Sequence, residues 1–111
     1  MVSVGGYMKF KINGSTWTIK EIPKDQFEIK DEGCIAETVY LRQEIHLRND
    51  SKSKLADLKH ELCHVWLYEY GHVQNDEYKF HYEQVCEIVA RSNDFINKVV
   101  TDYLKKEVNK C

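Results

Sequence analysis

The chain has 111 residues, of which 42% are hydrophobic and 31% are charged, and its formal net charge is −2. This length fits one domain, and the composition is typical of a folded globular protein. The chain has no excess of positive charge that would hold nucleic acid, and it has no run of about 18 apolar residues that could span a membrane. We therefore expect a single domain over residues 1–111 that spans no membrane, and the charge gives no support to a nucleic-acid partner.

The cysteines and the N-terminus indicate the compartment. Cys34, Cys63, Cys86 and Cys111 are widely spaced and include no C-x-x-C pair, which is typical neither of a zinc knuckle nor of a disulfide framework. Residues 1–10 lack the basic and then apolar pattern of a secretory signal. We expect free thiols and a cytoplasmic protein.

The first third of the chain has the pattern of β-strands. Polar and apolar residues alternate over 9–12 and again over 16–22, and Asn13-Gly14 lies between these runs. Asn-Gly between alternating runs predicts a hairpin, because both turn positions need a positive φ. The apolar residues expected on one buried face are Phe10, Ile12, Trp17 and Ile19. Alternation returns over 35–47, which predicts one long strand or two short ones.

The second half of the chain has the pattern of helices. Asn49-Asp50-Ser51 offers helix N-caps, and Gly71 offers a helix stop, so we expect a helix over about 52–70. Its apolar stripe comprises Leu55, Leu58, Leu62, Val65 and Trp66. A second pattern runs over about 77–106, and Ser92-Asn93-Asp94 could start a third helix within it. The predicted class is α+β: a small, mainly antiparallel sheet of three or four strands followed by two or three helices.

Segment 60–64 reads His-Glu-Leu-Cys-His, an H-E-x-x-H motif inside the first predicted helix. Residues four apart share one helical face, so His60 and His64 can bind one zinc ion. Glu61 is rotated by about 100° from His60, so it reaches a water on the metal and acts as general base. Cys63 points away from the metal face and is expected to be a packing residue.

Catalytic zinc needs a third protein ligand. The downstream candidates are His72, Asp76, His81, Glu83 and Glu87. Glu83 and Glu87 are four residues apart on the second predicted helix and therefore share a face. One of them could bind the metal while the other accepts a hydrogen bond from a ligand histidine.

H-E-x-x-H on one helix, with a glutamate on the next helix about 20 residues later, resembles the gluzincin arrangement. The wider stretch from Gln43 through the motif to Ala90 is similar to small phage-type or mobile-element metallopeptidases and, more distantly, to the ImmA/IrrE peptidases. The resemblance implies a minimal zincin-like fold, with Glu83 as the third ligand and Glu87 as its hydrogen-bonding helper. It also implies an edge strand near Ile45–Leu47 that pairs with an extended substrate, although a plain structural strand is the simpler interpretation there. Two residues depart from the family pattern, because Cys86 replaces a common Ala and Glu87 replaces a common Asp.

Three hypotheses about function follow. The first is a zinc-dependent peptidase that hydrolyses a peptide or protein substrate, with Glu61 as general base. Its oxyanion donor would come from His72, His81, Tyr70, Tyr78 or Tyr82. The second is a catalytically inactive zinc-binding interaction module on the same scaffold, and the third is a structural protein without a metal. Because the chain is short, we expect a shallow site that a protein partner or an oligomer could complete.

Overall fold

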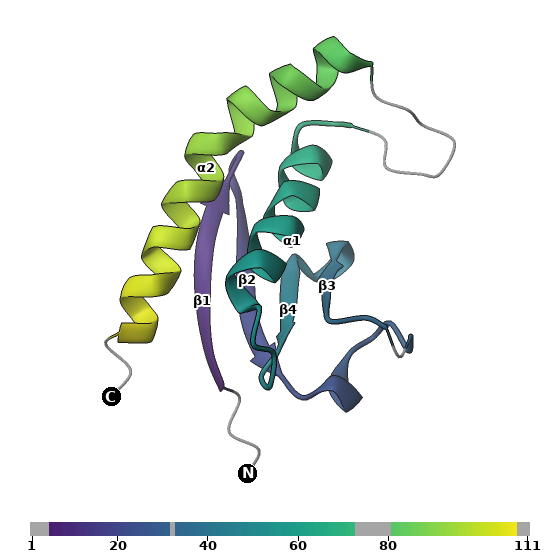
Figure 1. Ribbon diagram of the computed structural model, residues 1–111, viewed down its shortest axis with the longest axis vertical. Helices are drawn as coiled ribbons and strands as arrows, with labels where there is room; N and C mark the ends of the chain where they lie inside the picture. Colours follow the sequence, from purple (N-terminus) through teal and green to yellow (C-terminus); the bar gives the residue numbers. More distant parts are fainter. Residues whose placement is uncertain (1–4, 32, 73–80, 109–111) are drawn as a thin grey trace.

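In a computed structural model, which describes residues 5–31, 33–72 and 81–108, the predicted hairpin is present as β1 (Gly5–Ile12) and β2 (Ser15–Ile22) (Figure 1). Asn13 and Gly14 form its turn with φ of 50° and 82°, as a two-residue hairpin loop requires. Phe10 lies opposite Trp17, and both are buried. The predicted hairpin and its apolar face are therefore confirmed.

Stretch 35–47 forms two short strands, β3 (Ala36–Val39) and β4 (Glu44–Arg48). A single 3-10 turn, η2 (Tyr40–Arg42), and a left-handed Gln43 with φ of 53° reverse the chain between them. The sheet order is β1-β2-β4-β3. The outer pairings are antiparallel and the central pairing, β2 with β4, is parallel. The α+β class is confirmed, with a mixed sheet.

Of the two edge strands, β1 and β3, it is β3 that lies beside the helix that carries residues 60–64. The expectation that Ile45–Leu47 forms that edge is wrong, because β4 lies between β2 and β3. Ile45 and Leu47 are fully buried instead, so the plain structural interpretation of this segment is correct. The short 3-10 helix η1 (Lys24–Gln26) lies in the connection from β2 to β3.

The first predicted helix is α1 (Lys54–Glu69). It begins after Ser53 rather than at the predicted caps 49–51, because Ser51 and Ser53 both donate hydroxyl hydrogen bonds to Asp57 in the first turn. It ends at Gly71 with φ of 80°, where His72 N donates to Leu67 O at 2.8 Å. Together with the bond from Gly71 N to Tyr68 O at 3.2 Å, it forms a Schellman motif. The predicted helix stop is therefore confirmed.

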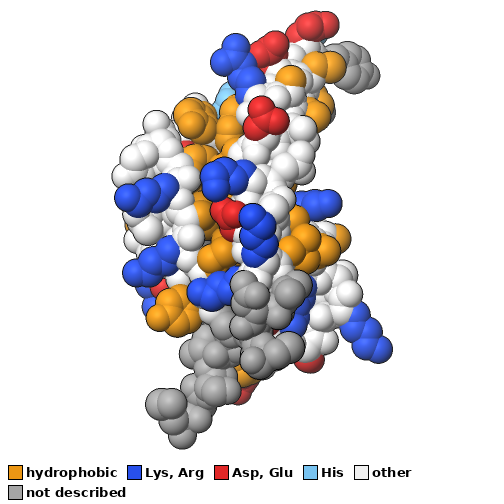
Figure 2. Space-filling view, turned by 90° about the vertical axis from the view of Figure 1, so that its left-hand side faces the viewer, with side chains coloured by type: hydrophobic (Ala, Val, Ile, Leu, Met, Phe, Trp, Pro, Cys, Tyr) orange, Lys and Arg blue, Asp and Glu red, His pale blue; other side chains and the backbone are white. Residues whose placement is uncertain are grey.

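The second helix, α2 (Tyr82–Val108), is continuous. The third helix that Ser92-Asn93-Asp94 could start is therefore absent, since this polar triplet lies inside α2 with Ser92 buried. Charged side chains are scattered along the outer surface of α2, with hydrophobic and other side chains between them (Figure 2). Neither described helix is long and apolar enough to cross a membrane.

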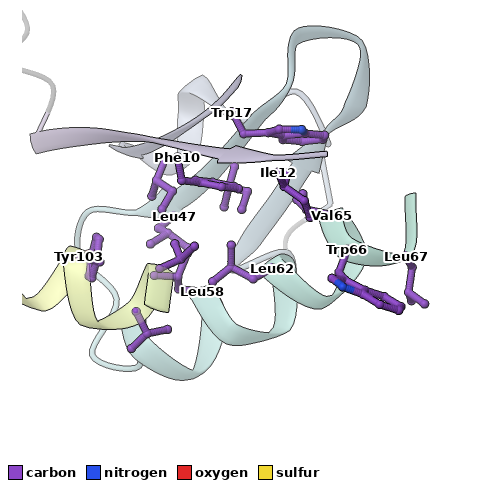
Figure 3. Close-up of a cluster of buried hydrophobic side chains, with 14 of the residues drawn as sticks. Phe10, Ile12, Trp17, Leu47, Leu58, Leu62, Val65, Trp66, Leu67 and Tyr103 are labelled. Atoms are coloured by element: carbon purple, nitrogen blue, oxygen red, sulfur yellow. The ribbon is translucent and has the colours of Figure 1, made fainter. Parts of the chain in front are cut away.

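The core lies between one face of the sheet and the two helices (Figure 3). Leu58 and Leu62 of α1 meet Leu47 of β4, and Tyr103 closes the core from α2. Of the predicted α1 stripe, Leu55 is the exception, because it is 39% exposed. The buried stripe fixes the rotation of α1 about its axis, and so it fixes which residues of the motif face away from the core.

Candidate metal centre

The histidines of the motif lie on the accessible side of α1. His60 is exposed and His64 is partly buried. Their Nε2 atoms lie 3.3 Å apart, and their ring centroids are 5.0 Å apart. The helix brings the two rings together because residues i and i+4 are neighbours on its surface.

This spacing fits one metal ion. Two nitrogens that bind a tetrahedral zinc ion at 2.0–2.1 Å lie about 3.3 Å from each other. The Nε2 atoms of His60 and His64 have that separation. Two imidazole nitrogens at this separation are a donor pair that zinc accepts, so the residues present fit two of its ligands.

Glu61 lies beside the histidines but on the inner side of α1, where it is only 7% exposed. Thr38 of β3 donates a hydrogen bond from Oγ1 to Glu61 Oε1 at 2.7 Å. A buried carboxylate needs such a partner, because burial without one is costly. The motif therefore contacts the edge strand of the sheet through its glutamate.

Three aromatic side chains, those of Trp17, Tyr40 and Tyr68, contact one another near the motif. Tyr68 follows His64 by four residues, and its ring lies 4.8 Å from that of Tyr40 in η2. Trp17 contacts both rings edge-on. Burial raises the pKa of Tyr40, and the negative charge of Glu61 and the neighbouring Tyr68 raise it further. The Tyr40 phenol is therefore close enough to Glu61 to interact with its charge.

A pocket of about 430 Å³ opens next to Glu61. It is lined by the segment before β3 and by the first half of α1: Gly33, Cys34, Ile35, Ala36, Ala56, Asp57, His60 and Glu61. Cys34 donates from Sγ to the carbonyl oxygen of Ala36 at 3.0 Å, and burial raises its pKa. The thiol is thus held in its protonated form, which is a weak metal ligand and a weak nucleophile.

Glu83 and Glu87 do not join the histidines. Both are exposed and line a second pocket, of about 750 Å³, between the end of α1 and the start of α2. Glu87 accepts a hydrogen bond from Arg91 at 2.7 Å. Among the described residues, no group of three or more His, Cys, Asp or Glu side chains could hold a metal ion. Glu83 as third ligand and Glu87 as its helper therefore stay predictions.

The predicted oxyanion donors lie elsewhere too. Tyr70 and His72 both pack on Trp66, with ring centroids at 5.0 and 5.7 Å, and line the same pocket as Glu83. His81 is exposed just before α2, and its backbone N–H donates to Gln84 Oε1. Asp76, Tyr78 and the side chain of Tyr82 fall outside the described residues.

Cys63 behaves as the sequence predicts, because it packs against the core, and burial raises its pKa. Cys34, Cys63 and Cys86 form no disulfide. Sequence reasoning did not select Thr38, Tyr40 or Tyr68. Tyr68 could have been found from its spacing to His64 on the helix, whereas Thr38 and Tyr40 depend on which strand forms the edge.

Comparisons with known proteins place no further constraint on the site. No protein-family model, no curated protein and no solved structure matches the chain.

Proposed function

We propose that the chain is a zinc-dependent metallopeptidase in which His60 and His64 bind the metal and Glu61 is the general base. The observation that carries this proposal is the 3.3 Å separation of the two Nε2 atoms beside a buried glutamate. A purely structural metal site has no use for a carboxylate that is not a ligand at that position. The sequence of the motif and its geometry on α1 therefore point to the same chemistry.

The roles of the residues follow from their positions. When bound, zinc supplies Lewis-acid chemistry, since it polarises a carbonyl oxygen and makes water more acidic. Glu61 takes a proton from the attacking water and gives it to the leaving amine as the C–N bond breaks. Two imidazoles leave catalytic zinc one protein ligand short. Glu83, with Glu87 beside it, stays the predicted third ligand in this proposal, although the structure places both in the pocket of about 750 Å³ and not with the histidines.

The substrate in this proposal is an extended peptide. Within the described part of the chain, no strand pairs with the outer edge of β3, and such an edge can pair with a peptide backbone. The pocket of about 430 Å³ beside Glu61 then receives one substrate side chain. The exposure of His60 leaves the metal face open to a long chain, which favours protein or peptide substrates over small enclosed ones.

The test uses a mixed peptide library, with cleavage followed by mass spectrometry. Zinc-loaded wild type is compared with Glu61→Gln at equal measured zinc content, and Asp102→Asn is the control for loss of a surface carboxylate. We expect Glu61→Gln to cleave at least about 100-fold more slowly, the size of a general-base contribution, and the control to match the wild type. Equal cleavage by wild type and Glu61→Gln rejects the peptidase, and zinc binding without any cleavage supports the interaction module instead.

A further inference from the structure

The glutamate of the motif is held from outside its own helix. Glu61 Oε1 accepts the hydroxyl hydrogen bond of Thr38 at 2.7 Å, across the interface between β3 and α1. A hydrogen bond to a charged acceptor is stronger than a neutral one, and a mostly buried position protects it from water. The carboxylate is therefore not free to rotate as it would be on an isolated helix.

The register of the sheet decides that this contact exists. Thr38 lies opposite Ile45, which is buried beneath the helices, whereas the neighbouring Glu37 points to the other face. A shift of one residue would turn the hydroxyl away from α1. The β-branched side chain of threonine also restricts χ1, so the hydroxyl has few alternative directions.

The hydrogen bond from Thr38 gives the two carboxylate oxygens of Glu61 different roles. Oε1 is occupied by Thr38, which leaves Oε2 for a water molecule. A general base acts only when its oxygen lies within about 2.6–3.2 Å of the atom that carries the proton. A fixed Oε1 therefore sets where Oε2 lies relative to a substrate bound on the same strand, β3.

We infer that Thr38 is a positioning residue, which orients Glu61 for proton transfer and ties it to the substrate-binding edge strand. This inference rests on the proposed function. Because the hydroxyl donates to the carboxylate, Thr38 itself neither takes nor gives the reacting proton. Its removal should therefore slow the chemical step and leave metal binding and substrate affinity as they are.

The first test is kinetic and uses zinc-loaded Thr38→Val, which keeps the shape of the side chain, and Thr38→Ser, which keeps the hydroxyl. Thr18→Val, on the other sheet face, is the matched control. We expect Thr38→Val to lower kcat about 10–100-fold, as the loss of an orienting partner does, with KM and zinc affinity unchanged. Thr38→Ser and the control should stay within about threefold of the wild type. An unchanged kcat in Thr38→Val, or an equal loss in Thr38→Ser, overturns the inference.

The second test needs no activity. Thr38→Val, Glu61→Ala, which removes the acceptor that Glu61→Gln would keep, and the double variant are unfolded with urea in the metal-free state. If the two side chains hold each other, the changes in the urea midpoint are non-additive; additive changes overturn the inference. If the wild type shows no cleavage that depends on Glu61, the proposed function fails and the catalytic role of Thr38 fails with it, whereas the urea cycle still decides whether Thr38 holds the carboxylate.

Discussion

On one face of the sheet His46 lies between Glu37 and Glu44, whereas on the other face His60 and His64 lie beside Glu61. The two sites contain the same kinds of side chain. In the first, His46 is 3% exposed, its Nδ1 is 2.5 Å from Glu37, and its Nε2 is 2.8 Å from Glu44. Each ring nitrogen thus faces its own carboxylate, so the imidazole has no nitrogen left for a metal.

The first site, built on His46, Glu37 and Glu44, stabilises the chain segment between β2 and β3. Glu37 also accepts the backbone N–H groups of Glu28 and Ile29. Burial raises the pKa of Glu44, but hydrogen bonds from Lys20 and His46 outweigh it and lower the pKa overall. In the second site the two Nε2 atoms lie 3.3 Å from each other on the accessible side of α1. The partners of the ring nitrogens, rather than residue type, therefore separate a structural cluster from a candidate metal centre.

The largest expected effect contrasts the two glutamates in the metal-free protein. Glu37→Gln should lower the free energy of unfolding by about 3 kcal/mol, because an amide N–H₂ replaces an acceptor that serves buried donors. Glu61→Gln should change it by no more than about 1 kcal/mol, since the amide oxygen still accepts from Thr38. Urea unfolding measures the free energy of unfolding of both variants. Equal losses would show that both glutamates have the same structural role.

The second prediction sharpens the metal side of the comparison. If Glu83 is the third ligand, Glu83→Gln should weaken zinc binding about 100-fold, and Glu87→Gln, which removes only an orienting partner, about 10-fold. Isothermal titration of zinc into each variant measures the difference. His72→Ala is the control, because His72 stacks on Trp66. A larger loss in His72→Ala than in Glu83→Gln would move the third ligand to the histidine.

The smallest effect concerns Tyr40, whose pKa is raised by burial and further by Glu61 and Tyr68. Glu61→Gln removes one of these causes, so the pKa of Tyr40 should fall but stay above its ordinary value. Since folding favours the neutral phenol, the stability that Tyr40 contributes is lost as the pH rises above about 10. A ¹³Cζ NMR titration of the tyrosines follows this group. An unchanged Tyr40 titration in Glu61→Gln would place Tyr40 away from the glutamate.

Local sequence signals predicted the elements well. Asn13-Gly14 determined the hairpin, because its backbone conformation is local. Gly71 ended α1 for the same reason. The spacing of His60 and His64 placed both on one face of a helix, and that periodicity is a property of the helix alone.

The sheet order and the contacts across it were not predictable in the same way. Which strand forms the edge depends on the parallel pairing of β2 with β4, which joins segments far apart in the chain. Thr38 and Glu37 are neighbours with opposite roles, and only the register of β3 assigns each to its face. The predicted N-caps of α1, residues 49–51, lie a few residues before the observed start. The hydroxyls of Ser51 and Ser53 instead donate hydrogen bonds to Asp57 in the first turn of the helix.

Zinc K-edge X-ray absorption on protein loaded with one equivalent of zinc tests the central claim most directly. The account predicts two imidazole ligands, with oxygen ligands completing a shell at about 2.0–2.2 Å, and loss of imidazole scattering in His60→Ala and His64→Ala. A shell with sulfur at about 2.3 Å, or a spectrum that is the same in the wild type and both histidine variants, would contradict it.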